Sequence, residues 1–281
     1  MPAWFREKRT TNQIAEQIFT PPRQACAAGV FRVLGVPVNA VQIPEVVAQM
    51  ESWISARTAS SHFIAVTGMH GVTEAQHEPY FKEILNSADL VVPDGMPLVW
   101  LGRRHGFRLR RRVYGPELMQ SFCGVTGFKY RHFLYGGAPG VAPLLADVLQ
   151  RKYGVQIAGT YSPPFGPLSS NEDDEIIALI HATNADVLWV GLSTPKQERW
   201  MYEHRPKLRV PVAVGVGAAF DLISGRSRQA PRWMREHGLE WSFRLLQEPR
   251  RLWRRYLVYG SEFVWSAAFE LASLSLRKLW R

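Results

Sequence analysis

The sequence has few cysteines and no export signal. Its 281 residues include only Cys26 and Cys123, which lie far apart and show no paired metal-ligand spacing. This number excludes a disulfide framework and is typical of a reducing compartment. The first twenty residues are polar and charged, without the apolar run of a signal peptide, so we expect no export.

Long apolar runs are also missing. No stretch reaches the roughly 20 uninterrupted apolar residues that a membrane-spanning helix needs. The nearest candidate, residues 256–276, is interrupted by Gly260, Glu262 and Glu270. If this segment is helical, its apolar side chains form one stripe, which predicts a helix that lies along an interface. That interface is either a membrane surface or the protein itself, including a partner subunit.

A recognisable metal-binding pattern is lacking as well. The clustered acids, Glu172 to Glu175, directly follow Ser169 and open a predicted helix, where negative charge complements the helix dipole. The eight histidines are dispersed and show no ligand spacing. We therefore expect no metal cofactor. If the protein catalyses a reaction with an anionic leaving group, the charge of that group would be met by Arg, Lys and backbone amides.

Positive charge is in excess. The formal net charge is +10, and it is concentrated in two segments. Residues 103–112 contain six Arg and no acid, whereas residues 226–255 contain nine Arg against three Glu, interleaved with Trp and Phe. An anionic partner is expected. The second segment is compatible with a phospholipid surface, a solvated charged face, or a nucleic-acid surface on which aromatic rings stack on bases.

Short β-branched runs alternate with helical periods between Phe31 and about Phe220. The predicted strands are residues 31–38, 62–66, 90–92, 132–135, 155–159, 187–190 and 212–216. This alternation predicts an α/β fold, with a Rossmann-like, largely parallel sheet and helices on both faces. We divide the chain into a loosely ordered leader (1–28), an α/β core (29–225) and a basic helical appendage (226–281). Pro249 should separate two helices within the appendage.

Ligands of open parallel sheets bind beyond the carboxyl ends of the strands. Asp94 stands directly after a predicted strand and before a helix. A carboxylate there suits a general base that takes a proton from an attacking hydroxyl group. The alternative is an Asp that caps the next helix.

Other strand ends carry residues suited to phosphate or sugar. Gly136 and Gly137 allow a diphosphate to approach backbone amides at a helix start, or form a tight structural turn. A Rossmann-type oxidoreductase is another enzyme class to consider for this predicted fold. The spacing of these glycines lacks the G-x-G-x-x-G fingerprint expected of that class. Gly191 ends a strand shortly before Gln197, which either reaches a ligand or stays a polar surface residue. Asp221 is either a helix cap or a contact for a polar ligand.

Six segments resemble one family. TGMHGVTEAQ, NSADLVVPDGMPLVW, YGGAPG, GLSTPKQERWM, GVGAAFD and QAPRWMREHGLEWSFRLLQEPRRLWRRY occur in the order and at the spacing of the WecG/TagA/CpsF glycosyltransferases. The resemblance covers roughly residues 31–256. It implies inverting, metal-independent transfer from a UDP-sugar to a polyprenyl-diphosphate-linked glycan in bacterial cell-surface polysaccharide synthesis. It further implies a cytoplasmic enzyme held peripherally at the anionic inner face of the plasma membrane, with no nucleic-acid partner; a homo-oligomer is left open.

The resemblance also assigns roles to single residues. Asp94 is similar to the family's presumed base, and Arg244, Arg251 and Arg254 resemble its C-terminal arginines for acceptor and membrane. The residues similar to its donor-binding positions are Thr67, Arg112, Gln197 and Asp221. Two departures concern the donor. Met69 stands where relatives often have Asn, leaving that contact missing or supplied by His70, and the segment YGPELM after Arg112 differs from the usual small residues.

Overall fold

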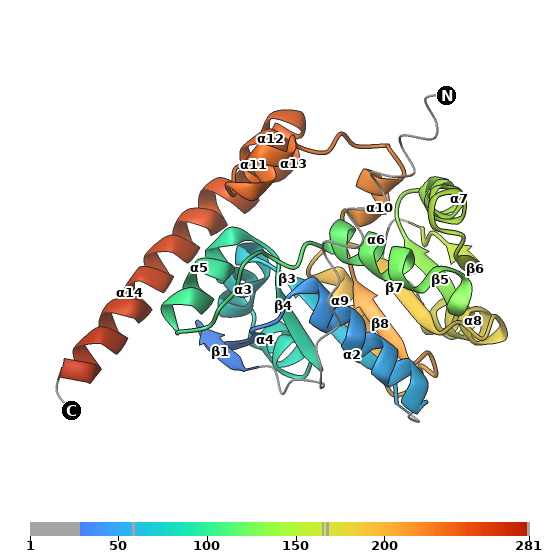
Figure 1. Ribbon diagram of the computed structural model, residues 1–281, viewed down its shortest axis with the longest axis horizontal. Helices are drawn as coiled ribbons and strands as arrows, with labels where there is room; N and C mark the ends of the chain where they lie inside the picture. The colour runs from blue at the N-terminus through green and yellow to red at the C-terminus, as the bar shows by residue number, and fades with distance from the viewer. Residues whose placement is uncertain (1–28, 58–59, 165, 167–168, 280–281) are drawn as a thin grey trace, which may run out of the picture.

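The computed structural model describes residues 29–57, 60–164, 166 and 169–279. The predicted leader, residues 1–28, lies outside the described residues. The described chain forms a sheet with helices on both faces, followed by a helical C-terminal segment that runs along one side (Figure 1).

The first two strands form a separate hairpin. β1 (Val30–Val33) pairs antiparallel with β2 (Val36–Asn39). The prediction of one continuous strand over residues 31–38 is therefore wrong. The chain reverses because Leu34 and Gly35 both have positive φ values, of 52° and 81°. Two such residues in a row form the tight turn that suits a hairpin, and the non-glycine Leu34 concealed it in the sequence.

The remaining strands form one six-stranded sheet in the order β4-β3-β8-β7-β5-β6. All its neighbouring strands are parallel. The strands are β3 (His62–Thr67), β4 (Leu90–Pro93), β5 (Arg131–Gly136), β6 (Gln156–Tyr161), β7 (Val187–Gly191) and β8 (Val212–Gly215). The predicted fold class is thus confirmed, and the carboxyl ends of these strands share one edge.

Helices cover both faces because successive strand residues point in opposite directions. Phe63 and Leu188 belong to one buried cluster, whereas their neighbours Ile64 and Trp189 belong to the other. The first face carries α3 (Met69–His77), α4 (Pro79–Asn86), α8 (Ser170–Ala182) and α9 (Lys196–His204). The second carries α2 (Ile43–Ala56), α6 (Gly115–Thr126), α7 (Val141–Tyr153) and α10 (Ala219–Ile223). The short helices α5 (Met96–Arg104) and η1 (Gly127–Lys129) connect to α6 and β5.

The acidic cluster lies in the first turn of α8. Ser169 Oγ accepts a hydrogen bond from the backbone N–H of Glu172 at 3.3 Å, and Glu172 Oε2 accepts one from the N–H of Ser169 at 2.8 Å. These two bonds form a capping box, which satisfies backbone donors that the helix leaves free. The helix-capping interpretation of this cluster is confirmed.

The C-terminal segment, which we call the appendage, is helical. Its elements are α11 (Arg232–Glu236), α12 (Glu240–Gln247), α13 (Pro249–Trp253), the π-helical turn η2 (Arg254–Val258) and α14 (Tyr259–Leu279). Pro249 occupies the first turn of α13, as predicted, because a helix start needs no proline N–H.

Helix α14 packs along α3 and extends past the core (Figure 1). Glu270 Oε2 accepts a hydrogen bond from the backbone N–H of Leu34 at 3.0 Å, so the helix also contacts the hairpin. Phe263 is buried against the core, whereas Trp265 and Phe269 are each 78% exposed. One face therefore docks on the protein itself. Among the described residues, no helix is both long and apolar enough to cross a bilayer.

Candidate active site

The strand ends and the appendage enclose a cavity of about 300 Å³. Its lining includes Val66, His70, Asp94, Tyr114, Ser193, Thr194, Gln197, Gly217, Arg244, Arg251 and Arg255. Ser193 and Arg251 also line a larger cleft of about 940 Å³ above the ends of β5 and β7. The two hollows are therefore neighbours, and together they offer room for a ligand that extends along the edge of the sheet.

Asp94 is the carboxyl group at this cavity. The N-cap of α5 is Gly95, not Asp94, so the capping alternative is not adopted. The backbone N–H of Asp94 donates to the carbonyl oxygen of Thr67 at 2.8 Å, which fixes the residue just beyond β4. Its Oδ1 atom is buried and accepts no hydrogen bond from any described residue. The carboxyl group is held in place while one oxygen remains available.

The surroundings of Asp94 bring its titration close to neutral pH. Burial raises the pKa of the carboxyl group to about 6, because the charged form loses hydration. Arg112 is the strongest opposing influence on this pKa, and Glu240 acts in the same direction as burial. Arg244 of α12 and Arg255 of η2 lower it further from the appendage. An Asp with a pKa near 6 is ionised at pH 7 and still basic enough to accept a proton.

Arg112 is engaged by the appendage. Its Nη2 donates to Glu240 Oε2 in a largely buried ion pair. The hydroxyl of Tyr114 donates to the other oxygen, Oε1, at 2.5 Å. The Arg112 guanidinium also lies over the Tyr114 ring, 4.1 Å from its centroid. In this arrangement Nη2 of Arg112 is paired with Glu240, and the phosphate contact foreseen for Arg112 stays a prediction.

Gln197 is buried and organises two turns. Its Oε1 accepts the backbone N–H of Gly217 at 2.9 Å, and its Nε2 donates to Glu198 Oε1 at 2.9 Å. The same Glu198 oxygen accepts from the hydroxyl of Thr194 at 2.8 Å. The surface alternative for Gln197 is wrong, because the side chain is only 1% exposed. It lines the cavity, and both of these hydrogen bonds go to the protein.

The glycine-rich strand ends allow close contact between β5 and β7. Gly136 has φ +127°, and a Cβ there would come within 2.6 Å of the Gly191 backbone. Gly137 donates its N–H to the carbonyl oxygen of Gly191 at 3.1 Å. These glycines therefore serve a structural turn. Gly137 and Gly191 also line the large cleft, so the predicted role in diphosphate binding remains open to test.

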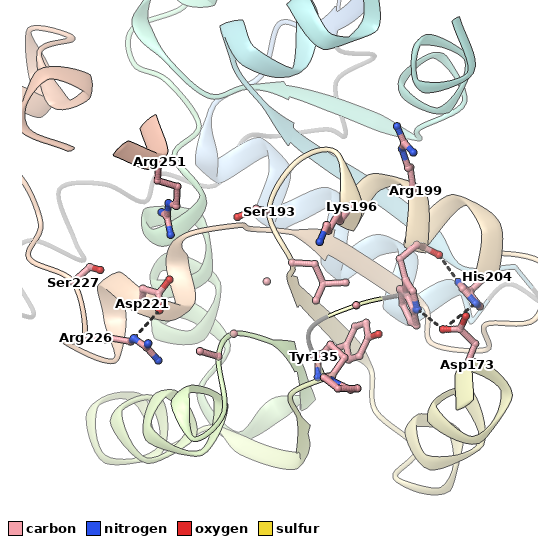
Figure 2. A pocket seen from close by; sticks show the side chains of 18 of the residues that line it. Tyr135, Asp173, Ser193, Lys196, Arg199, His204, Asp221, Arg226, Ser227 and Arg251 are labelled. Carbon is pink, nitrogen blue, oxygen red and sulfur yellow. Dashed lines mark hydrogen bonds and ion pairs between the residues drawn. The ribbon is translucent and has the colours of Figure 1, made fainter. Parts of the chain in front are cut away.

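Figure 2 shows the large cleft from close by. Lys196, from the first turn of α9, and Arg251, from α13, bring cationic groups to it. Asp221 lies on the same side of the cleft as Arg251, with its Oδ1 3.8 Å from Arg226 Nε. The far end is aromatic, since the rings of Tyr135 and Trp200 lie 4.4 Å apart.

Two predicted residues lie away from the hollows described here. The Oγ1 atom of Thr67 is buried without a hydrogen-bond partner among the described residues, and a Cβ on Gly71 would approach it to 2.1 Å. Thr67 therefore faces the start of α3. Arg254 is exposed, whereas its neighbour Arg255 lines the cavity with Arg244 and Arg251. The donor role of Thr67 and the acceptor and membrane role of Arg254 stay predictions.

Sequence reasoning missed Arg255 as a site residue. Arg251 and Arg255 are four positions apart, a spacing that places residues on one face of a helix. Arg244 lies on the other side of the bend at Pro249, so no single helical period joins all three arginines. The side chain of His70 also lines the cavity, and its Nδ1 has no partner among the described residues. Burial lowers the pKa of His70 to about 3, with Arg255 acting in the same direction, so the ring is neutral.

A carboxyl group with a pKa near neutrality, facing a cavity ringed by cations, is typical of an enzyme that acts on an anionic substrate. Residues 31–277 match the glycosyl transferase WecG/TagA/CpsF family, and the chain belongs to this family. The resemblance inferred from the sequence is thereby confirmed. Glycosyl transfer is favoured over the oxidoreductase and nucleic-acid alternatives.

Several curated proteins are similar to this chain. A protein from Bacillus spizizenii is 34% identical over 186 residues, which are 66% of this chain and 70% of the relative. One from Bacillus subtilis is 33% identical over 63% of this chain and 68% of its own length. A Staphylococcus aureus protein is 26% identical over 79% of this chain and 86% of its own. Each is named an N-acetylglucosaminyldiphosphoundecaprenol N-acetyl-beta-D-mannosaminyltransferase.

Proposed function

We propose that this protein transfers an N-acetylmannosaminyl group from its UDP-sugar to N-acetylglucosaminyl diphosphoundecaprenol or a closely related lipid-linked acceptor. The names of the relatives supply the sugar and the acceptor. The reaction would serve the synthesis of a cell-surface polysaccharide. The observation that carries the proposal is the position of Asp94, whose free Oδ1 is buried at a cavity lined by Arg244, Arg251 and Arg255.

The proposed step is a single displacement. The Asp94 carboxylate takes the proton from an acceptor hydroxyl group while that oxygen forms a bond to the anomeric carbon of the donor. The bond from this carbon to the diphosphate oxygen breaks, and UDP leaves with the electron pair. Attack from the face opposite the leaving group inverts the anomeric carbon. Cations that face the cavity stabilise the negative charge that develops on the diphosphate.

The two hollows suggest where each part of the substrates lies. The sugar to be transferred must reach Asp94, so we place it in the smaller cavity. The nucleotide extends into the large cleft, where Lys196 faces the diphosphate and Asp221 can accept a hydrogen bond from a hydroxyl group. The amides near Gly137 and the turn held by Gln197 shape the wall between them. The donor site proposed here uses side-chain cations and involves no metal ion.

We further propose that the appendage holds the enzyme at the membrane that carries its acceptor. Exposed large apolar side chains gather on it: Trp233, Leu239, Trp241, Leu246, Trp253, Leu257, Val258, Val264, Trp265 and Phe269. Tryptophan favours the headgroup level of a bilayer. Arg244 and Arg251 line the cavity, so we assign them chiefly to the acceptor diphosphate, whereas the exposed Arg254 is free to meet anionic headgroups at the inner face of the plasma membrane.

The test is sugar transfer by purified protein. UDP-N-acetylmannosamine and N-acetylglucosaminyl diphosphoundecaprenol are incubated with the wild type, Asp94→Asn and Asp147→Asn, and lipid-linked product is measured. Asp147 is a matched control because it is an exposed carboxylate, paired with Arg151, that lines none of the described hollows. We expect Asp94→Asn to lose about 10² to 10⁴ in rate and Asp147→Asn to retain activity.

Retained transfer by a folded Asp94→Asn protein would contradict the assignment of the base. A panel of UDP-N-acetylglucosamine, UDP-glucose and UDP-N-acetylmannosaminuronic acid tests the sugar separately. Faster transfer from one of these than from UDP-N-acetylmannosamine would overturn the proposed donor while leaving the reaction class intact.

A further inference from the structure

We propose that Glu240, Arg112 and Tyr114 form a clamp that fastens the appendage over Asp94, and that Arg112 is a positioning residue within it and no ligand of the donor diphosphate. The inference rests on the proposed function for the role of Asp94. The contacts of the clamp do not depend on that role. Its members come from both sides of the cavity: Glu240 begins α12, whereas Arg112 and Tyr114 belong to the loop that precedes α6.

Glu240 is a buried carboxylate, and both of its oxygens are hydrogen-bonded. The residue is 6% exposed, and its two carboxylate oxygens accept from different groups, Arg112 at Oε2 and the Tyr114 hydroxyl at Oε1. A buried carboxylate is costly unless such partners satisfy it. Both partners lie in one loop, so undocking α12 would leave that loop's cation and hydroxyl without their acceptor. The contact therefore favours the docked appendage.

The clamp is connected to Asp94 through the backbone. Val113, between the two clamp residues, donates its N–H to the carbonyl oxygen of Pro93 at 2.8 Å. Pro93 directly precedes Asp94. Moving the loop that carries Arg112 would therefore shift the end of β4. This short path makes the placement of the base depend on the docking of α12.

Charges reach Asp94 from three elements. Those acting on its titration are Arg112 from the loop, Glu240 and Arg244 from α12, and Arg255 from η2. Tyr114 and the neutral His70 of α3 also line the cavity. Arg112 and Glu240 act in opposite directions on the pKa of Asp94, Arg112 lowering it and Glu240 raising it. Removing one of these two charges therefore leaves the effect of the other on the pKa of Asp94 uncompensated.

A second ion pair between the appendage and the core provides a control. Arg235 Nη1 of α11 lies 2.7 Å from Glu117 Oε1 of α6. This pair also joins the appendage to the core, but neither residue lines the hollows next to Asp94. Glu117→Gln thus loosens docking without changing the charges that act on the base.

The experiment compares Arg112→Gln, Glu240→Gln, the double variant and Glu117→Gln. Hydrogen exchange of the backbone amides in residues 240–247 reports docking of α12. We expect the exchange rate to rise by about tenfold or more in Arg112→Gln and in Glu240→Gln, because each single change leaves a buried partner unpaired. In the double variant the increase should be smaller than the product of the two single increases, because both changes break the same contact. Multiplicative effects would show that the two residues act independently and would overturn the clamp.

The pH profile of the transfer rate distinguishes positioning from simple loss of structure, through its acid limb, the pH range in which the rate falls as Asp94 is protonated. Arg112→Gln should move the limb to higher pH, and Glu240→Gln should move it to lower pH, each by about half a unit or more. Glu117→Gln should show no such shift. Shifts in the same direction for both clamp variants would contradict the inference. If the acid limb is absent from every protein, the base assignment fails, while exchange still reports the clamp.

Binding of UDP tests whether Arg112 meets the donor diphosphate. In a clamp, Arg112→Gln and Glu240→Gln loosen the same contact, so we expect their dissociation constants for UDP to agree within about threefold. A loss of affinity of about tenfold or more confined to Arg112→Gln would assign Arg112 to the diphosphate and overturn the proposal. Isothermal titration calorimetry with UDP alone suffices, because no acceptor or turnover is needed.

Discussion

Gln197 Oε1 accepts the backbone N–H of Gly217 at 2.9 Å, and this bond joins the first turn of α9 to the turn after β8. The two turns come from neighbouring strands, β7 and β8. Because Gln197 also donates to the buried Glu198, its amide cannot rotate freely. The side chain thus holds the wall between the cavity and the large cleft.

The first prediction concerns Gln197→Ala. The Gly217 N–H loses its acceptor, and the turn that leads to Asp221 is no longer held. We expect the free energy of unfolding to fall by about 1–3 kcal/mol and the dissociation constant for UDP to rise by about tenfold. Gln120→Ala is the matched control, since Gln120 accepts from the Tyr153 hydroxyl and lines none of the described hollows. An unchanged affinity for UDP in Gln197→Ala would show that the turn does not need this bond.

Parts of this site were predictable because their signals are local. A β-branched run followed by Asp94 predicts a carboxylate at a strand end, and alternating strands and helices predict a parallel sheet. The capping box at Ser169 and the bend at Pro249 likewise depend on residues a few positions apart. In each case the physical cause lies within one element and its flanking turn.

The clamp could not be predicted in this way. Arg112 and Glu240 are 128 positions apart, and no pattern in the sequence around either residue predicts the pairing. Glu240 reads as an ordinary acid in a basic segment, and the family resemblance assigned Arg112 to the donor and not to Glu240. Their pairing is decided by how the appendage packs over the strand ends, which is a property of the tertiary structure. For the same reason, Arg255 was overlooked in favour of the exposed Arg254.

The second prediction is the pH dependence of transfer. The pKa of Asp94 is raised to about 6, chiefly by burial. A general base must be unprotonated, so activity should be full above this pKa and fall as the pH drops through it. We expect kcat/KM to decrease about tenfold per pH unit below the limb. The profile is measured with acceptor in detergent. A limb near pH 4, the ordinary range of an Asp, would show that the site does not perturb this carboxyl group.

The third prediction concerns the contact between β5 and β7. Gly136→Ala should lower the free energy of unfolding by about 3 kcal/mol or more, because it combines an unfavourable φ with a collision against the Gly191 backbone. Gly140→Ala is the control. Gly140 also has positive φ, of +82°, but a Cβ there meets nothing within 4 Å, so only about 1–2 kcal/mol of backbone strain is expected. Urea unfolding measures both. Equal losses would show that the close approach of the strands contributes little.

The fourth prediction addresses the membrane. Trp265 and Phe269 of α14 are each 78% exposed. Replacing both with serine removes apolar surface that would otherwise enter the headgroup region. At about 1.5–3 kcal/mol for full burial of each large side chain, we expect partitioning onto vesicles of anionic phospholipid to fall by at least tenfold. UDP binding should stay unchanged, because neither residue lines the cavity or the large cleft.

Phe128→Ser is the matched control for this experiment. Phe128 is 76% exposed in η1, outside the appendage, and it is compared with Phe269→Ser alone, so that each variant removes one exposed phenylalanine from a different part of the molecule. Vesicle flotation then distinguishes a contact made specifically by α14 from non-specific adsorption of exposed apolar side chains. If Phe128→Ser and Phe269→Ser lose the same affinity, the appendage has no special role at the bilayer. If only Phe269→Ser loses affinity, and the variant with both α14 changes transfers sugar more slowly to vesicle-borne acceptor than to detergent-solubilised acceptor, the exposed face of α14 delivers the active site to its lipid substrate.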